Sequence, residues 1–152
     1  MPIHNNFYLH NNQISPHLLK NIGPRLMAEI HVPPILTTYL AQKGQPIPAP
    51  IPGQALLDTG ASISAIDSNA VVNLGINPIG VTSVYTSGGV VQQNIYPIRF
   101  VFPAIGMLTI DFNAVIGSDL QPQGIIALVG RDVLSHCLLV YNGPAGMCSV
   151  SI

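Results

Sequence analysis

Hydrophobic residues in this chain fall mostly into short β-branched runs, and few of them follow the three- and four-residue spacing of amphipathic helices. Gly, Pro and Asn bound these runs, as is typical of strands joined by turns. The predicted strands cover residues 25–32, 35–41, 54–58, 80–86, 90–102, 107–117 and 125–129, with a closing hairpin over residues 138–152. Many short strands with little helix predict an all-β domain that closes into a β-barrel.

Two short segments carry helix signals instead. "DSNAVVNLG" has Asp67 or Ser68 as a helix cap and Gly75 as a stop, which predicts one short helix. "DVLSHC", residues 132–137, predicts a single further turn of helix. The Pro-rich stretch "GQPIPAPIPG", residues 44–53, predicts an extended connection across the surface.

The start of the chain is rich in Asn and His and has no periodicity. We interpret residues 1–24 as an N-terminal arm or peripheral segment. Residues 25–152 are then expected to form one domain, since a chain of 152 residues is long enough for one core.

The composition is poor in charge, and this narrows the classes of partner. Only 7% of the residues are charged, and five Lys and Arg residues stand against six Asp and Glu residues. Without a basic patch, no nucleic-acid partner is predicted. A surface with so few charges protects weakly against association, so we expect part of it to be covered by another chain.

No run of about 18 apolar residues occurs, so no membrane span is predicted. The N-terminus has neither a basic start nor a continuous apolar stretch, so we expect no signal peptide and a cytoplasmic location. Neither a metal nor a cofactor is predicted.

Two cysteines are too few for a zinc site, and their positions argue against a disulfide. A hairpin turn centred on Pro144 and Ala145 would place Tyr141 opposite Cys148, which separates the sulfur of Cys148 from that of Cys137. We therefore expect free thiols and a reducing compartment.

The stretch "ALLDTGASISAID", residues 55–67, places Asp58 directly after a buried apolar strand. An ionised carboxylate is costly there unless it is paired or hydrogen-bonded. Gly60 would let a backbone N–H approach the carboxylate, and the hydroxyl of Thr59 would brace the loop. This arrangement is typical of a catalytic carboxylate that activates water together with a second acid.

One chain supplies one such motif. The other five acidic residues are not followed by Thr-Gly or Ser-Gly. The second catalytic Asp is therefore expected from a second copy of the chain, related by a two-fold axis.

"LLDTGAS" resembles the active-site signature of the retropepsin-like aspartic proteases. Downstream, "IIALVGRDVL", residues 125–134, resembles the family's apolar strand that leads into Gly-Arg-Asp and a short helix. Between them, "VYTSGGVVQQNIY" resembles the family's flap hairpin. The resemblance extends over roughly residues 25–152.

The resemblance implies a closed β-barrel of the acid-protease type with one or two short helices, assembled as a C2 homodimer. Asp58, Thr59 and Gly60 would form the catalytic motif, with the two Thr59 residues interlocking across the axis. The flap residues Ser87, Gly88 and Gly89 would close over a peptide or protein substrate. Residues Gly130, Arg131 and Asp132 would support the active-site loop, with Arg131 buried or half-buried against Asp132 or a backbone carbonyl.

The chain also departs from the family pattern, because it ends in a whole hairpin rather than one short strand, and its flap tip is small and polar. Two classes of function stay open. The first is a homodimeric aspartic endopeptidase that uses water held between the two Asp58 carboxylates. The second is a catalytically silent retropepsin-like module that dimerises or binds peptides; retention of Asp58 and Gly60 favours the enzyme.

Overall fold

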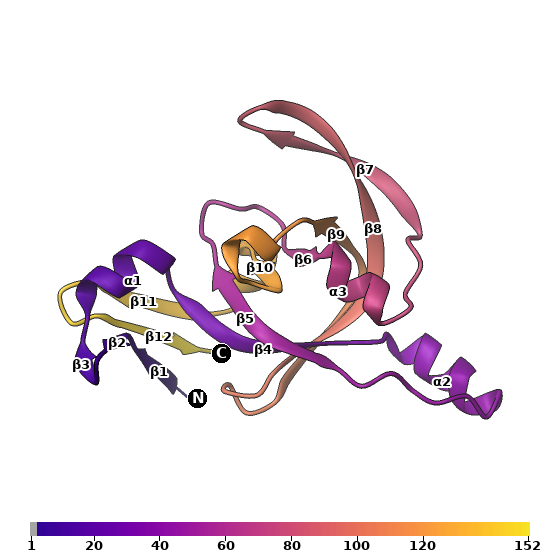
Figure 1. The fold of residues 1–152 in the computed structure, drawn as a ribbon, viewed down its shortest axis with the longest axis horizontal. Coiled ribbons are helices and arrows are strands. Elements are labelled where there is room, and N and C mark those ends of the chain that lie inside the picture. The colour runs from indigo at the N-terminus through magenta and orange to yellow at the C-terminus, as the bar shows by residue number, and fades with distance from the viewer. Residues whose placement is uncertain (1–2) are drawn as a thin grey trace.

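Strands make up most of the regular secondary structure of the computed structural model, which describes residues 3–152 (Figure 1). Its strands are β1 (Ile3–Phe7), β2 (Leu9–His10), β3 (Gln13–Ile14), β4 (Arg25–His31), β5 (Ile51–Leu57), β6 (Ala65–Asp67), β7 (Gly80–Thr86), β8 (Gly89–Phe102), β9 (Leu108–Ser118), β10 (Ala127–Val129), β11 (Leu138–Asn142) and β12 (Met147–Ser151). Its helices are α1 (Pro16–Ile22), α2 (Pro34–Gln42), α3 (Ser68–Asn73), α4 (Arg131–Leu134) and the 3₁₀ turn η1 (Gln121–Gln123). The prediction of a mostly β fold with few short helices is confirmed.

The main sheet has the strand order β4-β5-β10-β6-β9-β8-β7, and β4 also pairs with β8. The pairs β5–β10 and β6–β9 are parallel, and the other pairs are antiparallel. Strand β4 thus has a hydrogen-bonded neighbour on both edges, while β7 extends β8 into a long hairpin.

The core lies inside this curved sheet and follows from the two-residue period of its strands. In β4, the side chains of Leu26, Ala28 and Ile30 are buried, while the residues between them point outward. The fully buried Phe100 of β8 packs edge-on against Phe112 of β9, with ring centroids 5.6 Å apart. Burying an aromatic or large aliphatic side chain contributes about 1.5–3 kcal/mol, so this layer holds the sheet in its curved form.

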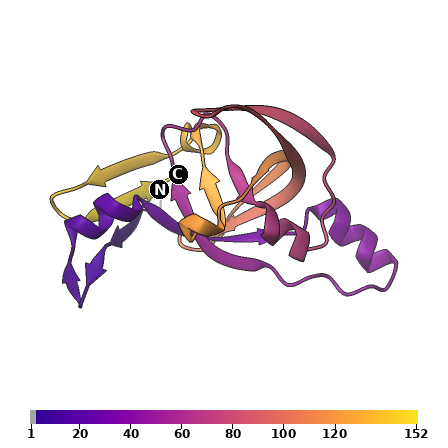
Figure 2. The ribbon, with the colours of Figure 1, turned by 45° about the horizontal axis from the view of Figure 1, so that its top comes forward.

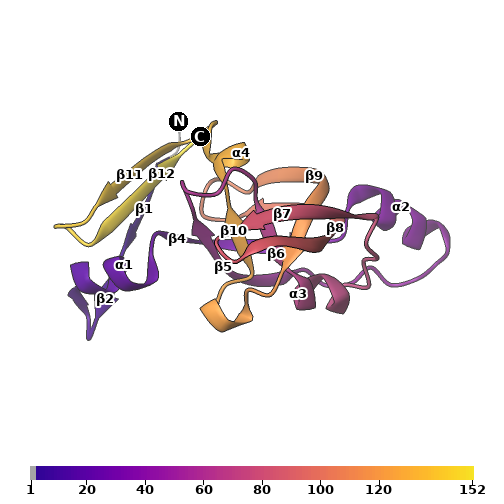
Figure 3. The ribbon, with the colours of Figure 1, turned by 90° about the horizontal axis from the view of Figure 1, so that it is seen from above.

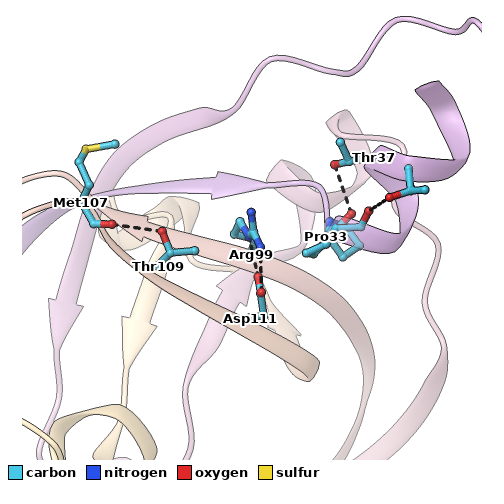
Figure 4. Close-up of polar contacts among 8 residues, drawn as sticks. Pro33, Thr37, Arg99, Met107, Thr109 and Asp111 are labelled. Atoms are coloured by element: carbon cyan, nitrogen blue, oxygen red, sulfur yellow. Dashed lines mark hydrogen bonds and ion pairs between the residues drawn. The ribbon is translucent and has the colours of Figure 1, made fainter.

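The strand predicted over residues 35–41 is wrong, because this segment is helix α2. Pro34 occupies its first turn, where no backbone N–H is required. The hydroxyls of Thr37 and Thr38 donate to the carbonyls of Pro33 and Pro34, at 3.4 and 3.1 Å (Figure 4). Pro33 and Pro34, which lie between the strands predicted over residues 25–32 and 35–41, instead start a helix, and none of its side chains is buried.

Over the described residues the structure has four α-helices, not the one or two expected. The helix that sequence reasoning missed at the N-terminus, α1, has clear local signals. The Ser15 hydroxyl accepts the N–H of Leu18 at 3.2 Å, Pro16 lies in the first turn, and Gly23 ends the helix with φ 74°. The two predicted helices are confirmed, and Asp67 is the cap of α3.

The two ends of the chain form a separate three-stranded sheet with the order β1-β12-β11. Strand β1 pairs antiparallel with β12, and the predicted register of the β11–β12 hairpin is confirmed by the pairing of Tyr141 with Cys148. This sheet lies at one end of the molecule and α2 at the other (Figures 1 and 3). Residues 3–22 of the expected arm therefore contribute both β1 and α1.

Candidate active site

Asp58 follows β5 at the point where the parallel pairing with β10 ends. Its backbone N–H donates to the carbonyl of Val129 at 2.9 Å, which extends this pairing by one residue. Leu57 before it is buried and Asp58 itself is half-buried. The two strands thus hold the backbone of Asp58 while its side chain remains accessible.

Gly60 brings a backbone donor to the carboxylate, as the sequence predicted. Its N–H donates to Oδ1 of Asp58 at 2.8 Å, and the N–H of Ala61 donates to the carbonyl of Asp58 at 3.3 Å. A Cβ atom at position 60 would lie 3.0 Å from Oδ1 of Asp58, so a larger residue would crowd the carboxylate. The loop therefore orients one carboxylate oxygen, while no hydrogen bond to the other is found among residues 3–152.

Residues 130–132 contact the loop that carries Asp58 along much of its length. The N–H of Arg131 donates to the carbonyl of Ala61 at 2.9 Å, and that of Asp132 donates to the carbonyl of Ser62 at 3.2 Å. Gly130 is buried, and a Cβ at this position would lie 2.6 Å from the backbone carbon of Ile63. Only glycine lets the two backbone segments come this close.

Ser64 is the residue of this assembly that sequence reasoning missed. It is buried; its hydroxyl donates to Oδ1 of Asp132 at 2.7 Å, and its N–H donates to Oδ2 of Asp132 at 2.9 Å. The same hydroxyl accepts the N–H of Gly130 at 3.0 Å. The available signal was an acidic residue directly after Gly-Arg, whose carboxylate oxygens can accept N–H and O–H donors of the active-site loop as well as those of Arg131.

Arg131 differs from its expected environment. Its side chain is exposed, so the predicted burial is wrong, and its guanidinium donates to the carbonyl of Thr59 at 2.7 Å rather than to Asp132. The reason is that the Asp132 carboxylate is already occupied by Ser64 and by the N–H of Val133. Of the two predicted partners, a backbone carbonyl is therefore the correct one.

The segment with Ser87, Gly88 and Gly89 forms the tip of the β7–β8 hairpin, where Thr86 pairs with Gly89. The Thr86 hydroxyl accepts the N–H of Gly88 at 3.2 Å and donates to the carbonyl of Gly89 at 2.9 Å. The hairpin arches over the side of the molecule where the β5–β6 loop lies (Figures 1 and 2). Its tip is exposed, and Tyr85 beside it is 85% accessible.

The other carboxylates of the chain are mostly engaged elsewhere. Buried Asp67 accepts the N–H groups of Ala70 and Leu120 at 3.1 and 3.0 Å. Glu29 contacts His31 at 2.8 Å, and hydrogen bonding to Arg99 lowers the pKa of Asp111. Asp58 is thus the accessible carboxylate on this loop, and each chain has one such carboxylate.

Both cysteines are free, and the two thiols lie in different environments. Burial raises the pKa of Cys148 to about 11 and also raises the pKa of the half-buried Cys137. In the part of the chain that the structure describes, no group of three or more His, Cys, Asp or Glu side chains could hold a metal ion. No helix in that part is long and apolar enough to cross a membrane.

Comparison with known proteins assigns the chain that carries this site to a family. The profile of a family described as aspartyl protease matches residues 44–133, more than half of the chain. Comparison with curated proteins found no match. Among solved structures, the solution structure of the simian foamy virus (mac) protease is similar, with 20% identity over 74% of this chain and 92% of that chain and a TM-score of 0.45. On the extent of the profile match, which includes Asp58 and residues 130–132, this chain belongs to the aspartyl protease family.

Proposed function

We propose that this chain is an aspartic endopeptidase that acts as a C2 homodimer, with a water molecule activated between Asp58 of each protomer. The observation that carries the proposal is the half-buried Asp58 carboxylate, oriented by the N–H of Gly60 on a loop that residues 130–132 hold in place. Membership of the aspartyl protease family supports it.

The chemistry follows from two close carboxylates that share one proton. The ionised Asp58 accepts a proton from the water, whose oxygen attacks the peptide carbonyl carbon. The protonated Asp58 of the second copy donates to the carbonyl oxygen and stabilises the tetrahedral intermediate. Transfer of a proton to the amide nitrogen then lets the peptide bond break, and the sharing of the proton between the two carboxylates is restored.

The surrounding elements take supporting roles in this proposal. In the proposed dimer, the exposed Thr59 meets its counterpart in the second copy, and Arg131 supports it by donating to its carbonyl. The tip with Ser87, Gly88 and Gly89 closes over bound peptide, since few contacts restrain it. The pairing of β4 with both β5 and β8 supports a barrel closed on itself.

The decisive experiment compares the wild-type protein with Asp58→Asn on a diverse peptide pool. The amide keeps the shape of the carboxylate and can still accept the N–H of Gly60, but it cannot take a proton from water. We expect a folded dimer whose activity is at least about 10³-fold lower. Asp119→Asn, at an exposed acid outside residues 58–64 and 130–132, is the matched control and should keep full activity.

Activity should fall on both sides of an acidic optimum, since either two protons or none on the pair stops the reaction. Retained activity in a clean Asp58→Asn preparation would contradict the proposal. A wild-type protein that binds a statine-type peptide analogue but cleaves nothing would instead favour a silent peptide-binding module.

A further inference from the structure

Strands β4 and β5 are antiparallel neighbours, yet the chain that connects them is long. Ile30 and Ile51 pair at the end of the two strands where this connection begins. A loop of about two to five residues joins most pairs of this kind. Here residues 32–50 intervene and form α2, followed by a stretch that we call the proline segment, residues 45–50. This insertion lies at the end of the molecule opposite the sheet β1-β12-β11 (Figures 1 and 3).

Local sterics hold the proline segment in a polyproline II conformation. Prolines occupy every second position, at Pro46, Pro48, Pro50 and Pro52. The ring fixes φ of each proline at about −65°, and each residue before a proline is restricted to the extended and polyproline II regions. Every residue from 45 to 52 is therefore either a proline or the residue before one. In agreement, residues 45–50 lie in neither a helix nor a strand, and none of them has a positive φ.

Both ends of the proline segment are anchored. Before it, Gly44 has φ 63°, and its N–H donates to the carbonyl of Ala41 at 3.1 Å. The N–H of Gln45 donates to the carbonyl of Leu40 at 2.9 Å, which completes a Schellman cap on α2. After it, Ile51 enters β5. The proline segment therefore spans two fixed points, which adds to its rigidity.

The exposure of the proline segment follows the three-residue period of a polyproline II helix. Pro48 and Ile51, three positions apart, are half-buried, and Ile51 packs against the core. The positions between and before them are exposed, and Ile47 is 49% accessible. One edge of this helix thus faces its own domain. Two exposed pairs, residues 46–47 and 49–50, lie one turn apart on the side that faces solvent.

The backbone of the proline segment offers mainly acceptors. Among residues 3–152, no backbone–backbone hydrogen bond involves residues 46–50. The prolines have no N–H, so the carbonyl oxygens of these residues stand against the N–H groups of Ile47 and Ala49 alone. A partner must therefore supply hydrogen-bond donors next to an apolar surface.

The proline segment carries no charge, and its surroundings carry a single cation. Between Glu29 and Asp58 the only Lys, Arg, Asp or Glu is Lys43, whose Nζ lies 5.8 Å from the centre of the Tyr39 ring. Nucleic acids and anionic lipid surfaces are bound through several cations, which this insertion lacks. An apolar groove with a carboxylate at one end is complementary to this surface.

We propose that residues 45–50 are a docking site for a protein domain whose groove is lined by Trp and Tyr, with a carboxylate at the end that meets Lys43. Aromatic rings pack on proline rings, and the indole N–H and phenol O–H are donors for the free carbonyls of the proline segment. Because the polyproline II conformation exists before binding, little conformational entropy is lost in the complex. The inference does not rest on the proposed function, since no residue of the insertion belongs to the candidate active site.

The test measures binding of the full chain to a panel of purified SH3, WW and EVH1 domains, whose aromatic grooves recognise polyproline II segments. We expect at least one domain to bind, and Ile47→Glu to raise its dissociation constant at least about tenfold, because a carboxylate would enter an apolar and acidic groove. Val72→Glu is the matched control, since Val72 is 65% accessible on α3, and it should leave the constant unchanged. Absence of binding throughout the panel, or an equal loss in the two variants, would overturn the proposal.

Pro46→Ala tests the polyproline II geometry. It removes an exposed ring and loosens the backbone, so we expect the dissociation constant to rise about tenfold. A partner that pairs with the proline segment as a β-strand would instead gain an N–H group. Unchanged or tighter binding in Pro46→Ala would therefore overturn the proposed mode of recognition.

Lys43→Ala tests the carboxylate of the partner. We expect the dissociation constant to rise about threefold and to depend less on salt than in the wild type. An unchanged constant would overturn the assignment of a carboxylate to the groove. Vesicles with anionic lipids provide the alternative ligand, and binding to them that depends on Lys43, without binding to any domain of the panel, would overturn the proposal in favour of a membrane surface.

The outcomes separate this inference from the proposed function. Ile47→Glu should cleave peptides at the wild-type rate, and Asp58→Asn should bind the domain as tightly as the wild type. A wild-type chain that binds a domain but cleaves no peptide would overturn only the proposed enzyme. One that cleaves peptides but binds no domain would overturn only the docking site.

Discussion

The loop with Asp58 and the tip of the β7–β8 hairpin are made of similar small and polar residues, yet the structure holds them in opposite ways. The loop receives hydrogen bonds from three consecutive residues, 130–132, that are far away in sequence. The hairpin tip is bonded only within itself, through the hydroxyl of Thr86, among the interactions of the described chain. The loop is partly buried, and the tip is exposed.

This difference matches the two tasks that an endopeptidase of this kind would need. A catalytic carboxylate must hold its orientation, so its loop gains from fixed long-range bonds. A hairpin that covers a substrate must open and close, so it gains from having few contacts outside itself. The contrast can be tested by making the same change in both regions.

The largest expected difference comes from replacing a glycine with alanine in each region. In Gly130→Ala the new Cβ would lie 2.6 Å from the backbone of Ile63, so one backbone segment must shift. We expect a loss of about 1–3 kcal/mol in the free energy of unfolding and a loss of activity. In Gly88→Ala the nearest atom is the Thr86 hydroxyl at 3.8 Å, an ordinary contact, and the change should stay within about 0.5 kcal/mol.

Urea titration of both variants measures this difference. Equal destabilisation by the two alanines would show that the loop is no more constrained than the hairpin tip.

An effect of similar size on the free energy of unfolding is expected from replacing a carboxylate with an amide. In Asp132→Asn the amide NH₂ must face the backbone N–H of either Ser64 or Val133, so one hydrogen bond becomes a repulsive contact. The expected cost is about 1–3 kcal/mol. Asp111→Asn is the matched control, because its bond to Arg99 lies on the surface (Figure 4), and it should cost less than about 1 kcal/mol.

The stabilisation by the Asp111–Arg99 pair should also depend on pH. Arg99 lowers the pKa of Asp111 in the folded protein. The stabilisation from that pair is therefore present above the pKa that Asp111 has in the unfolded chain, and it is lost as pH falls through the pKa of Asp111 in the folded protein. The melting temperatures of wild type and Asp111→Asn should therefore converge at acidic pH. If the two melting temperatures still differ at low pH, the stabilisation does not come from the ionised Asp111 carboxylate.

The smallest effect on stability is expected at the hairpin tip itself. Thr86→Val removes the hydroxyl that bridges the turn, but the turn is exposed and water can replace both bonds. We expect a change within about 0.5 kcal/mol, together with faster hydrogen exchange at Gly88. The N–H of Ser64, which is bonded to Asp132, should exchange at the wild-type rate. Faster exchange at both positions would show that the two regions are coupled.

Local chemistry determined much of this protein from the sequence alone. The two-residue period of β4 and β8, the cap at Asp67 and the register of the closing hairpin all follow from neighbouring residues. The contact between the N–H of Gly60 and Asp58 was predicted for the same reason, since it spans two residues. The helix α2 was mistaken for a strand because β-branched residues follow its prolines, although Pro in a first turn favours a helix.

Only the tertiary structure decided which distant groups meet. The bond between Ser64 and Asp132 joins residues 68 positions apart, and the position of β1 beside β12 joins the two ends of the chain. Arg131 turned to the carbonyl of Thr59 because Ser64 and Val133 already occupied Asp132. Short-range signals fix strands, turns and caps because those depend on backbone preferences, whereas the pairing of a buried polar group depends on which donors the whole fold brings within reach.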